Sequence, residues 1–263
     1  MILIADSGGT NTMWALIDKH NVEYVKSAGM HPSQLGYGMI FPPALERHRN
    51  YITELYFYGT GCARQQGREK VKQFLANWFS NAHITVFSDL MALAHAGWGD
   101  EAGNVAILGT GSSMAYYDGF KLNFEVWSPG KEKDPGSGTD LALQILKLYE
   151  DAALSDDISG DLQKFLNKKL EQEDENGLLA RYIMQNQHNV VLSELCVKQF
   201  SSFFEFYALL LQKYPFPIVF GGSIAYLSSR LLNNVAKKHN LKIHSIIREP
   251  IYPLVELYLN RKV

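Results

Sequence analysis

Residues 3–18, LIADSGGTNTMWALID, carry the pattern that decides the fold of this chain. An apolar strand runs into a polar turn at residues 6–12, and alternating apolar residues then resume around Trp14 and Leu16, which predicts a second strand. The glycines of the turn let backbone amides approach an anionic ligand without a Cβ atom in the way. Asp6 ends the first strand and suits Mg²⁺, which takes few carboxylates and keeps its waters. The alternative is an ordinary β-hairpin that binds nothing.

A second copy of this turn occurs in residues 105–119, VAILGTGSSMAYYDG. The two copies begin roughly 100 residues apart, which is about the length of a small domain. Two such hairpins that face each other across a cleft would hold a polyphosphate from both sides. Two unrelated structural hairpins remain the alternative.

The overall composition is that of a folded globular protein with room for two domains. The chain has 263 residues, of which 46% are hydrophobic and 20% are charged. Its formal net charge of −2 gives no reason to expect a nucleic acid or an acidic membrane as partner. No basic segment with an apolar core begins the sequence, and no apolar run spans a bilayer, so we expect a cytoplasmic protein. The sequence does not decide between a monomer and a homodimer.

The predicted elements follow the same order in both halves. In the first half, strands are expected at 1–5, around Trp14 and Leu16, and at 22–27, 55–58 and 84–87. Helices are expected at 42–51, at 65–79 and from Leu90 onward. In the second half, strands are expected at 104–108, 113–117, 121–126, 217–220 and 241–247, and helices at 141–149, 191–213, 223–239 and 252–259. A charged, helical insertion with a solvated face is expected at about 155–190.

This order is β-β-β-α-β-α-β-α in each half, which predicts an α/β protein with two ribonuclease-H-like domains. Each domain is expected to have a mixed sheet flanked by helices, with a cleft between the domains. We place the domains at residues 1–97 and 98–263, with the terminal helix able to pack back on the first domain.

Two other phosphate-binding loops fit the sequence poorly. A Walker A motif needs Gly-Lys-Ser/Thr at the start of a helix, and the chain contains no such tripeptide. A dinucleotide fingerprint places its glycines between a strand and a helix. Here strands follow both glycine turns, and the second turn lacks the third glycine, which argues against NAD.

Five segments, in order, resemble the motifs of the actin-like ATPase superfamily, which contains hexokinase and heat-shock chaperones. Within it, the chain is most similar to the N-acetylglucosamine kinase-like group, also labelled the BadF/BadG/BcrA/BcrD ATPase family. The segments are residues 6–12 and 107–112 (phosphate motifs), 88–97 (catalytic aspartate), 134–138 (sugar and active site) and 219–223 (adenosine motif). The resemblance implies a kinase that uses ATP and Mg²⁺ to phosphorylate a small-molecule sugar.

The resemblance also implies a role for each matching residue. Asp89 would be the catalytic base, although a helix cap is the plain alternative for this position. Asp6 would hold Mg²⁺ through water. The residues expected at the ATP phosphates are Gly8, Gly9, Thr10 and Asn11 of the first turn, and Gly109, Thr110, Gly111 and Ser112 of the second. The residues expected at adenosine are Gly221, Gly222 and Ser223.

The substrate side departs from the family pattern. Ser113 stands where the sugar kinases usually have Asn, and residues 29–34 replace a loop that normally offers an Asn to the sugar. The Gly-Asp-Glu stretch has become residues 133–135, Lys-Asp-Pro. Buried hydrogen-bond partners set specificity for a polyol, so these changes put N-acetylglucosamine itself in doubt. The candidate substrate-binding residues are Ser33, Gln34, Ser113 and Asp134.

Two other functions compete with a sugar kinase. An ATPase that activates a partner enzyme usually carries cysteines that bridge an iron–sulfur cluster, but Cys62 and Cys196 lie in different motifs. A nucleotide- or sugar-binding regulator that has lost activity is the alternative favoured by the altered residues 133–135. A zinc site is not expected, because the eight histidines show no paired spacing.

Overall fold

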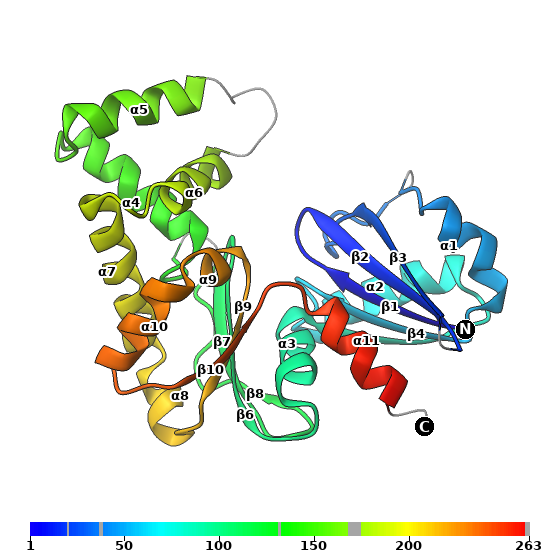
Figure 1. The fold of residues 1–263 in the computed structure, drawn as a ribbon. Helices are drawn as coiled ribbons and strands as arrows, with labels where there is room; N and C mark the ends of the chain where they lie inside the picture. The colour runs from blue at the N-terminus through cyan, green and yellow to red at the C-terminus, as the bar shows by residue number, and fades with distance from the viewer. Residues whose placement is uncertain (20, 37–38, 131–132, 168–174, 261–263) are drawn as a thin grey trace. The chain divides into compact units, whose positions relative to one another are not determined.

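The computed structural model describes residues 1–19, 21–36, 39–130, 133–167 and 175–260. Its contacts divide the chain into two compact units (Figure 1). Unit 1 contains Met1–Asp100 and the C-terminal segment that begins at Glu249. Unit 2 contains Glu101–Arg248. In the described ranges, every helix is too short or too polar to cross a membrane.

Unit 1 is a mixed five-stranded sheet in the order β3-β2-β1-β4-β5. Its strands are β1 (Ile2–Ser7), β2 (Asn11–Asp18), β3 (Asn21–Ala28), β4 (Glu54–Gly59) and β5 (His83–Ser88). Its helices are α1 (Pro43–His48), the short 3₁₀ helix η1 (Arg49–Tyr51), α2 (Gln65–Trp78), α3 (Asp89–Trp98) and α11 (Ile251–Asn260). β1 pairs antiparallel with β2 and parallel with β4, as expected for a hairpin followed by a helical crossover.

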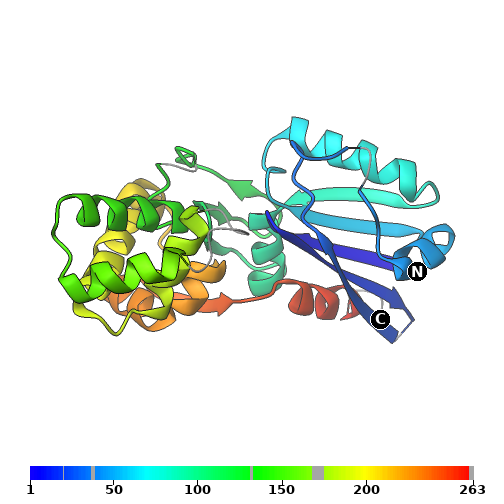
Figure 2. The same cartoon turned by 90° about the horizontal axis from the view of Figure 1, so that it is seen from above.

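Alternation along β1 directs side chains to two separate cores, one on each face of the sheet. Leu3 and Ala5 pack with residues of α1 and α2. Ile2 and Ile4 pack with residues of α3 and α11. Figure 2 shows α2 along one face of these strands. The C-terminal helix is therefore part of the core of unit 1.

Unit 2 has a second five-stranded sheet, in the order β10-β9-β6-β7-β8. Read from β8 to β10, this order repeats that of unit 1 strand for strand. Its strands are β6 (Gly103–Leu108), β7 (Ser112–Tyr117), β8 (Leu122–Asn123), β9 (Ile218–Gly221) and β10 (Ile243–Ile247). Its helices are α4 (Gly138–Glu150), α5 (Asp156–Asn167), α6 (Glu175–Gln185), α7 (Val190–Phe206), α8 (Ala208–Lys213), α9 (Ser223–Leu227) and α10 (Ser229–Lys238). The predicted α/β class with two mixed sheets flanked by helices is confirmed.

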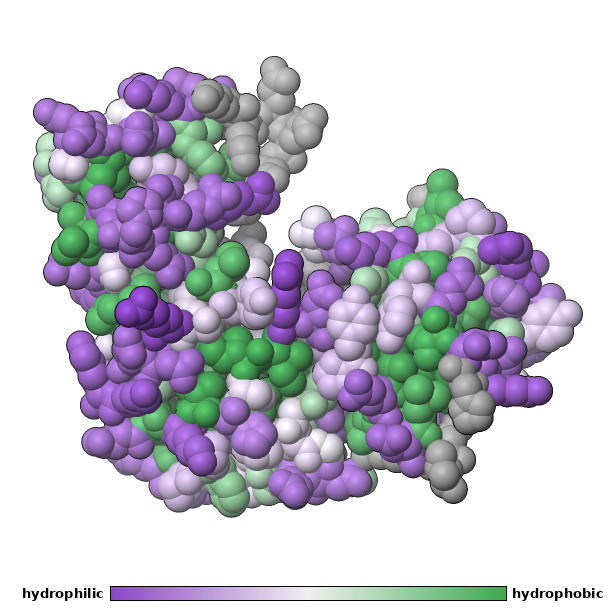
Figure 3. Space-filling model, viewed as in Figure 1, coloured by the Kyte–Doolittle hydropathy of each residue, from purple (hydrophilic) through white to green (hydrophobic). Residues whose placement is uncertain are grey.

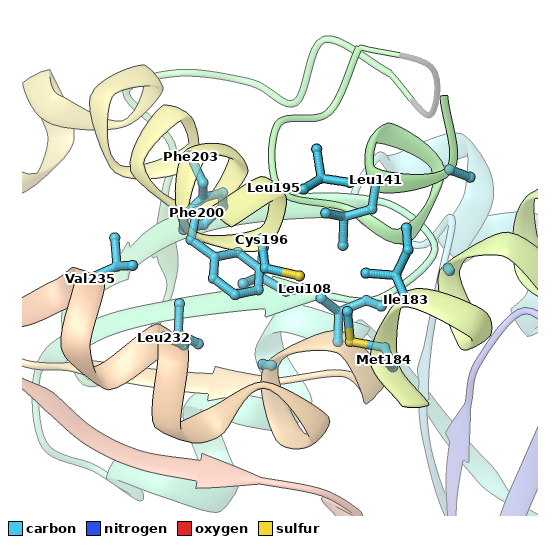
Figure 4. Packing of buried hydrophobic residues seen from close by; sticks show 14 of the residues in the cluster. Leu108, Leu141, Ile183, Met184, Leu195, Cys196, Phe200, Phe203, Leu232 and Val235 are labelled. Carbon is cyan, nitrogen blue, oxygen red and sulfur yellow. The ribbon is translucent and has the colours of Figure 1, made fainter. Parts of the chain in front are cut away.

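The core of unit 2 is one large hydrophobic cluster between β6 and its helices. Figure 4 shows Leu108 of β6 in this cluster with Phe200 of α7 and Leu232 of α10. The predicted insertion contributes to this core, because Ile158 and Leu162 of α5 are buried in the same cluster. The outer side of α5 is hydrophilic, as Figure 3 shows. Residues 168–174 of the insertion lie outside the described residues.

Three predicted elements of unit 2 differ from the structure. The strand expected at 121–126 is only Leu122–Asn123, because Phe124 leaves the alternation and stacks on Trp127, with ring centroids 4.4 Å apart. The helix expected at 191–213 is interrupted at Tyr207, whose ring is fully buried against Phe203. The helix expected at 223–239 is interrupted at Ser228, whose hydroxyl accepts a hydrogen bond from Gln187 at 2.7 Å.

Candidate functional site

In unit 1, two carboxylates lie at the carboxyl ends of neighbouring strands. Ser7, Gly59 and Ser88 are in register across β1, β4 and β5. Asp6 directly precedes this row on β1, and Asp89 directly follows it as the first residue of α3. Parallel strands bring their carboxyl ends to one edge of a sheet, which is where open α/β sheets bind ligands.

Ser88 is the residue that caps α3. Its hydroxyl accepts a hydrogen bond from the backbone N–H of Met91 at 3.3 Å, as an N-cap does. The Asp89 carboxylate accepts a bond from the Leu90 N–H at 2.9 Å and another from the Thr60 side chain. Ser88 therefore supplies the helix cap, which was the alternative explanation for Asp89.

Burial raises the pKa of both carboxyl groups. The pKa of Asp6 rises to about 7, first through desolvation and then through the negative charges of Asp89 and Glu249. The pKa of Asp89 also rises through desolvation, against the hydrogen bonds from Leu90 and Thr60 and the nearby His31, which lower it. Each carboxylate thus holds a proton more tightly than a surface aspartate does, as a general base requires.

We expect unit 1 to lose stability as the pH rises from about 4 to about 7. The Asp6 pKa lies near 7 in the folded protein and near 4 in the unfolded chain, so the folded state binds the extra proton in this window. Asp6→Asn should remove this loss and raise the free energy of unfolding near pH 8, by at most about 4 kcal/mol. Denaturant unfolding without divalent cations, at about pH 5 and about pH 8, measures the difference.

Asp118→Asn is the control for this pH effect. Asp118 is exposed, and hydrogen bonds from Lys121, Asn123 and Phe120 lower its pKa. Its substitution should therefore destabilise the protein at neutral pH, the opposite of Asp6→Asn. A stability difference between wild type and Asp6→Asn that is the same at both pH values would contradict the titration of Asp6.

The first glycine turn has an open outer side and a packed base. Gly8, Gly9, Thr10 and Asn11 are all exposed, and the Gly8 N–H donates to the Asn11 carbonyl at 3.0 Å. Beneath them, a Cβ atom on Gly29 would lie 2.6 Å from the Gly9 carbonyl oxygen. The 29–34 loop therefore lies directly on the turn that is predicted to bind phosphate.

His31 is the residue of this loop that sequence reasoning did not assign. Its Nδ1 is 2.6 Å from the Ser33 hydroxyl, and its Nε2 would be 2.6 Å from a Cβ atom on Gly61. It also acts electrostatically on Asp89. Ser33 and Gln34, the predicted substrate residues, are exposed nearby. The sequence signal for this position is a histidine two residues after Gly29, the glycine that packs against the first glycine turn.

Cys62 lies close to Asp89 but is not suited to nucleophilic chemistry. The thiol is fully buried, and burial together with the Asp89 charge raises its pKa to about 12. A thiol with that pKa stays protonated at neutral pH. Cys62 is a core residue of unit 1, as expected for a buried thiol without a histidine partner.

Unit 2 contains a cavity of about 210 Å³ that joins three of the predicted motifs. Gly109 and Thr110 of the second glycine turn line it, and so does Ser223 of the adenosine motif. Gly138, the last residue of the 134–138 motif, also lines it. The lining residues that sequence reasoning missed are Thr139, Asn176, Gly177, Ala180, Arg181, Met184, Ile224 and Leu227. Arg181 is the only ionisable side chain among these described residues.

Short backbone contacts hold these motifs together at this cavity. A Cβ atom on Gly222, whose φ is +96°, would lie 2.3 Å from the Leu108 carbonyl oxygen. The Gly138 N–H donates to the Gly109 carbonyl at 2.7 Å. Gly221 is the buried last residue of β9, directly before this contact. The start of α4 and the adenosine motif are thus both in backbone contact with the second glycine turn.

Asp134 binds the second glycine turn to the segment that follows β8. Its carboxylate accepts hydrogen bonds from the Ser112 N–H at 3.2 Å, the Ser128 hydroxyl at 2.5 Å and the Gly130 N–H at 3.0 Å. Only 4% of the residue is exposed. These contacts explain Asp134 as a residue that shapes the turn. Its role in binding substrate stays a prediction, as does that of Ser113, which is partly exposed.

The other members of the second turn lie beside Asp134. Gly111 leaves room for this carboxylate, because a Cβ atom there would lie 2.9 Å from Asp134 Oδ2. The Ser112 hydroxyl is buried and donates to the Pro135 carbonyl at 2.8 Å. Neither residue lines the cavity that Gly109 and Thr110 line.

Asp6 fits a magnesium ion. Its carboxylate accepts no hydrogen bond from any described residue, and two neighbouring carboxylates raise its pKa, so a cation would relieve the repulsion. Within the described parts of the chain, no group of three or more His, Cys, Asp or Glu residues forms a metal site. Mg²⁺ needs only one or two carboxylates when water supplies its other ligands.

Comparison with known proteins identifies the fold of the chain but not its family. No protein-family model matches, and no curated protein matches. Solved structures match over the whole chain. One, from Porphyromonas gingivalis and provisionally described as an N-acetylglucosamine kinase, is 24% identical with a TM-score of 0.87, and each chain is covered to 100%. Another with the same provisional description, from Chromobacterium violaceum, is 16% identical with a TM-score of 0.65 and coverage of 98% and 99%.

A ROK family glucokinase from Streptomyces griseus, solved with glucose and AMPPNP, also matches. It is 14% identical, with a TM-score of 0.57 and 97% of each chain covered. At these identities the likeness shows the fold alone, which is the actin-like ATPase fold of these sugar kinases. Membership of the BadF/BadG/BcrA/BcrD group stays a prediction.

Proposed function

We propose that the chain is an ATP-dependent kinase that transfers the γ-phosphate to a hydroxyl of an amino sugar of the N-acetylglucosamine class. The observation that carries the proposal is the pair Asp6 and Asp89, two carboxylates with raised pKa at the carboxyl ends of β1 and β5. Phosphoryl transfer needs a base near the acceptor hydroxyl and a cation near the phosphates, and this pair suits both tasks.

In the proposed reaction, each carboxylate has one role. Asp89 accepts the proton of the acceptor hydroxyl, and the Leu90 N–H and Thr60 hydroxyl fix its orientation. Asp6 holds Mg²⁺ through water, and the ion supplies positive charge to the phosphate oxygens when bound. The exposed turn at Gly8–Asn11 provides backbone N–H donors for the phosphates.

Unit 2 binds the nucleotide in this proposal. The second glycine turn, Gly109–Ser112, contacts the phosphates, and the cavity beside it receives the nucleoside. A volume of about 210 Å³ is smaller than the roughly 300–1,000 Å³ of a site that encloses a whole drug-sized ligand. The cavity therefore suits part of a nucleotide, with the phosphates outside it at the turn.

An amino sugar is the substrate class that the motifs and the structural neighbours favour together. Two of these neighbours carry the provisional description of N-acetylglucosamine kinase. In this chain, Ser33, Gln34 and Ser113 offer hydrogen-bonding side chains for a sugar. His31, in the same loop as Ser33 and Gln34, acts electrostatically on Asp89. Asp134 acts in the proposal by holding Ser112 in place.

Sugar-stimulated release of ADP tests the proposal. The protein is incubated with ATP and Mg²⁺ and a panel of hexoses, amino sugars and N-acylated amino sugars, and ADP is measured with a coupled assay. We expect an N-acylated amino sugar to give the largest stimulation. Binding of ATP without stimulation by any sugar would favour a nucleotide- or sugar-binding regulator, or an ATPase, over a kinase. A protein without magnesium-dependent affinity for ATP or ADP would overturn the kinase, the ATPase and the nucleotide-binding regulator.

A further inference from the structure

We infer that the buried hydroxyl of Tyr207 replaces the Ser112 N–H as hydrogen-bond donor to Asp134 and so leaves that N–H available to a phosphate. Tyr207 is thus a positioning residue for the second glycine turn, because it acts on the turn through Asp134. The inference rests on the proposed function, since it takes the ligand of the turn to be the phosphates of a nucleotide.

The backbone N–H of Ser112 has a partner other than a phosphate in the structure. Ser112 is predicted to contact the ATP phosphates, but it is buried, and its N–H donates to Asp134 Oδ2 at 3.2 Å. A backbone N–H has one proton to donate, so this bond competes with a bond to a phosphate oxygen. It is also the longest of the three bonds that Asp134 accepts, since those from Ser128 and Gly130 measure 2.5 and 3.0 Å. Phosphate binding at Ser112 therefore requires this bond to be exchanged.

The exchange needs a second donor at Asp134. Only 4% of this residue is exposed, and its Oδ1 already accepts the bonds from Ser128 and Gly130. A buried carboxylate oxygen that loses its donor costs more free energy than the bond itself contributes. Release of the Ser112 N–H would leave Oδ2 in that condition. A donor that is held beside Oδ2 removes this cost.

The Tyr207 hydroxyl has the properties of such a donor. The residue is fully buried, and its hydroxyl makes no hydrogen bond within the described parts of the chain. Burial and the negative charge of Asp134 raise the pKa of the hydroxyl, so the carboxylate is its neighbour, whereas the Met114 backbone opposes this rise. A backbone N–H such as that of Met114 only donates, so it offers the hydroxyl proton no acceptor. The Asp134 carboxylate offers one.

Packing of helix α7 fixes the position of this hydroxyl. Gln199, Phe203 and Tyr207 are spaced four residues apart, and the Tyr207 N–H donates to the Phe203 carbonyl at 3.2 Å, so all three share one side of a helical turn. That side lies on the segment 134–138. A Cβ atom on Gly136 would lie 3.2 Å from the Phe203 Cβ and 3.3 Å from the Gln199 carbonyl oxygen. The Tyr207 ring thus brings its hydroxyl to Asp134 without the help of a hydrogen bond.

Tyr207→Phe and Tyr117→Phe form a matched pair that tests the inference. Both tyrosines are buried in unit 2, and phenylalanine keeps the ring. The Tyr117 hydroxyl donates to the Gly119 carbonyl at 2.8 Å, at the opposite end of β7 from Ser112. We expect Tyr207→Phe to weaken the binding of ATP with Mg²⁺ by about 10- to 100-fold, which corresponds to one hydrogen bond to a charged group. Tyr117→Phe should bind ATP as the wild type does.

Stability without nucleotide should change in the opposite order. Tyr207→Phe removes a buried hydroxyl that has no partner among the described residues, so it should melt no lower than the wild type. Tyr117→Phe removes a hydrogen bond and should melt lower. A residue with a purely structural role would not combine full stability with weaker ATP binding.

Calorimetric titration with ATP and Mg²⁺ gives the affinities, and thermal melting without nucleotide gives the stabilities. Unchanged ATP affinity in Tyr207→Phe, or an equal loss in both variants, would overturn the inference and leave the proposed function intact. If Tyr207→Phe melts well below the wild type, its hydroxyl already has a partner, and the exchange is also wrong. A wild-type protein without magnesium-dependent affinity for ATP would overturn the proposed function as well.

Discussion

Asp89→Asn should lower the turnover number by about 10²- to 10⁴-fold and leave the affinity for ATP nearly unchanged. Asparagine has the shape of aspartate, and its amide oxygen can still accept the hydrogen bonds from the Leu90 N–H and the Thr60 side chain. It cannot accept a proton from the sugar hydroxyl. The loss should appear in the rate of ADP release at saturating ATP and sugar, whereas calorimetry should find ATP binding retained.

Asp156→Asn is the matched control for this experiment. Asp89 is the first residue of α3, and Asp156 is the first residue of α5. Both substitutions remove a negative charge from the start of a helix, where it interacts favourably with the helix dipole. Only Asp89 lies beside Asp6. If Asp89→Asn keeps more than about a tenth of wild-type turnover, Asp89 is not the base.

The same substitution also tests how the two carboxylates interact. The negative charge of Asp89 is one of the causes that raise the pKa of Asp6. Asp89→Asn should therefore move the Asp6 pKa down toward its ordinary value and shift the pH at which stability is lost to lower values. A folding defect alone would not produce this shift.

The sheets could be predicted from the sequence because their strands are short, apolar and separated by glycine turns. β1 and β6 are almost wholly buried, and each is followed by a hairpin whose register leaves the glycines at the tip. Two helix breaks could not be predicted. Tyr207 and Ser228 interrupt helices without a proline or glycine, and the cause is a buried ring in one case and a hydrogen bond across unit 2 in the other.

The parts of the candidate site that lie in glycine turns and at strand ends could be predicted from the sequence. The parts that depend on the packing of helices and loops could be predicted less well. Asp6 follows from its place at the end of a strand. Asp89 was assigned through the family resemblance, because its position alone suits a helix cap equally well. The contribution of α6 to the cavity was missed because the surrounding charges favour a solvated helix, although Gly177 and Ala180 of α6 line the cavity. His31 was not assigned because its position against Gly61 arises only when β3 and β4 are assembled in one sheet.

Gly222→Ala should cause the largest loss of stability in unit 2. The alanine Cβ would overlap the Leu108 carbonyl at 2.3 Å, and a backbone φ of +96° is strained for any residue with a side chain. Strain of about 1–3 kcal/mol and overlap of about 1–3 kcal/mol together predict a cost of about 2–6 kcal/mol. Because Leu108 directly precedes Gly109, the overlap should also displace the second glycine turn and weaken ATP binding.

Gly130→Ala separates the two causes of this loss. Gly130 also lies in unit 2 and has a φ of +112°, but a Cβ atom there meets nothing within 4 Å. It should show the cost of the strained backbone without the overlap. Because a chain of two compact units need not unfold in one step, the measurement is hydrogen exchange of the amides in β6 and β9. Protection in these strands should fall much further in Gly222→Ala than in Gly130→Ala. Equal loss in the two variants would mean that the contact with Leu108 relaxes at little cost, and that the close approach of the two motifs does not depend on glycine.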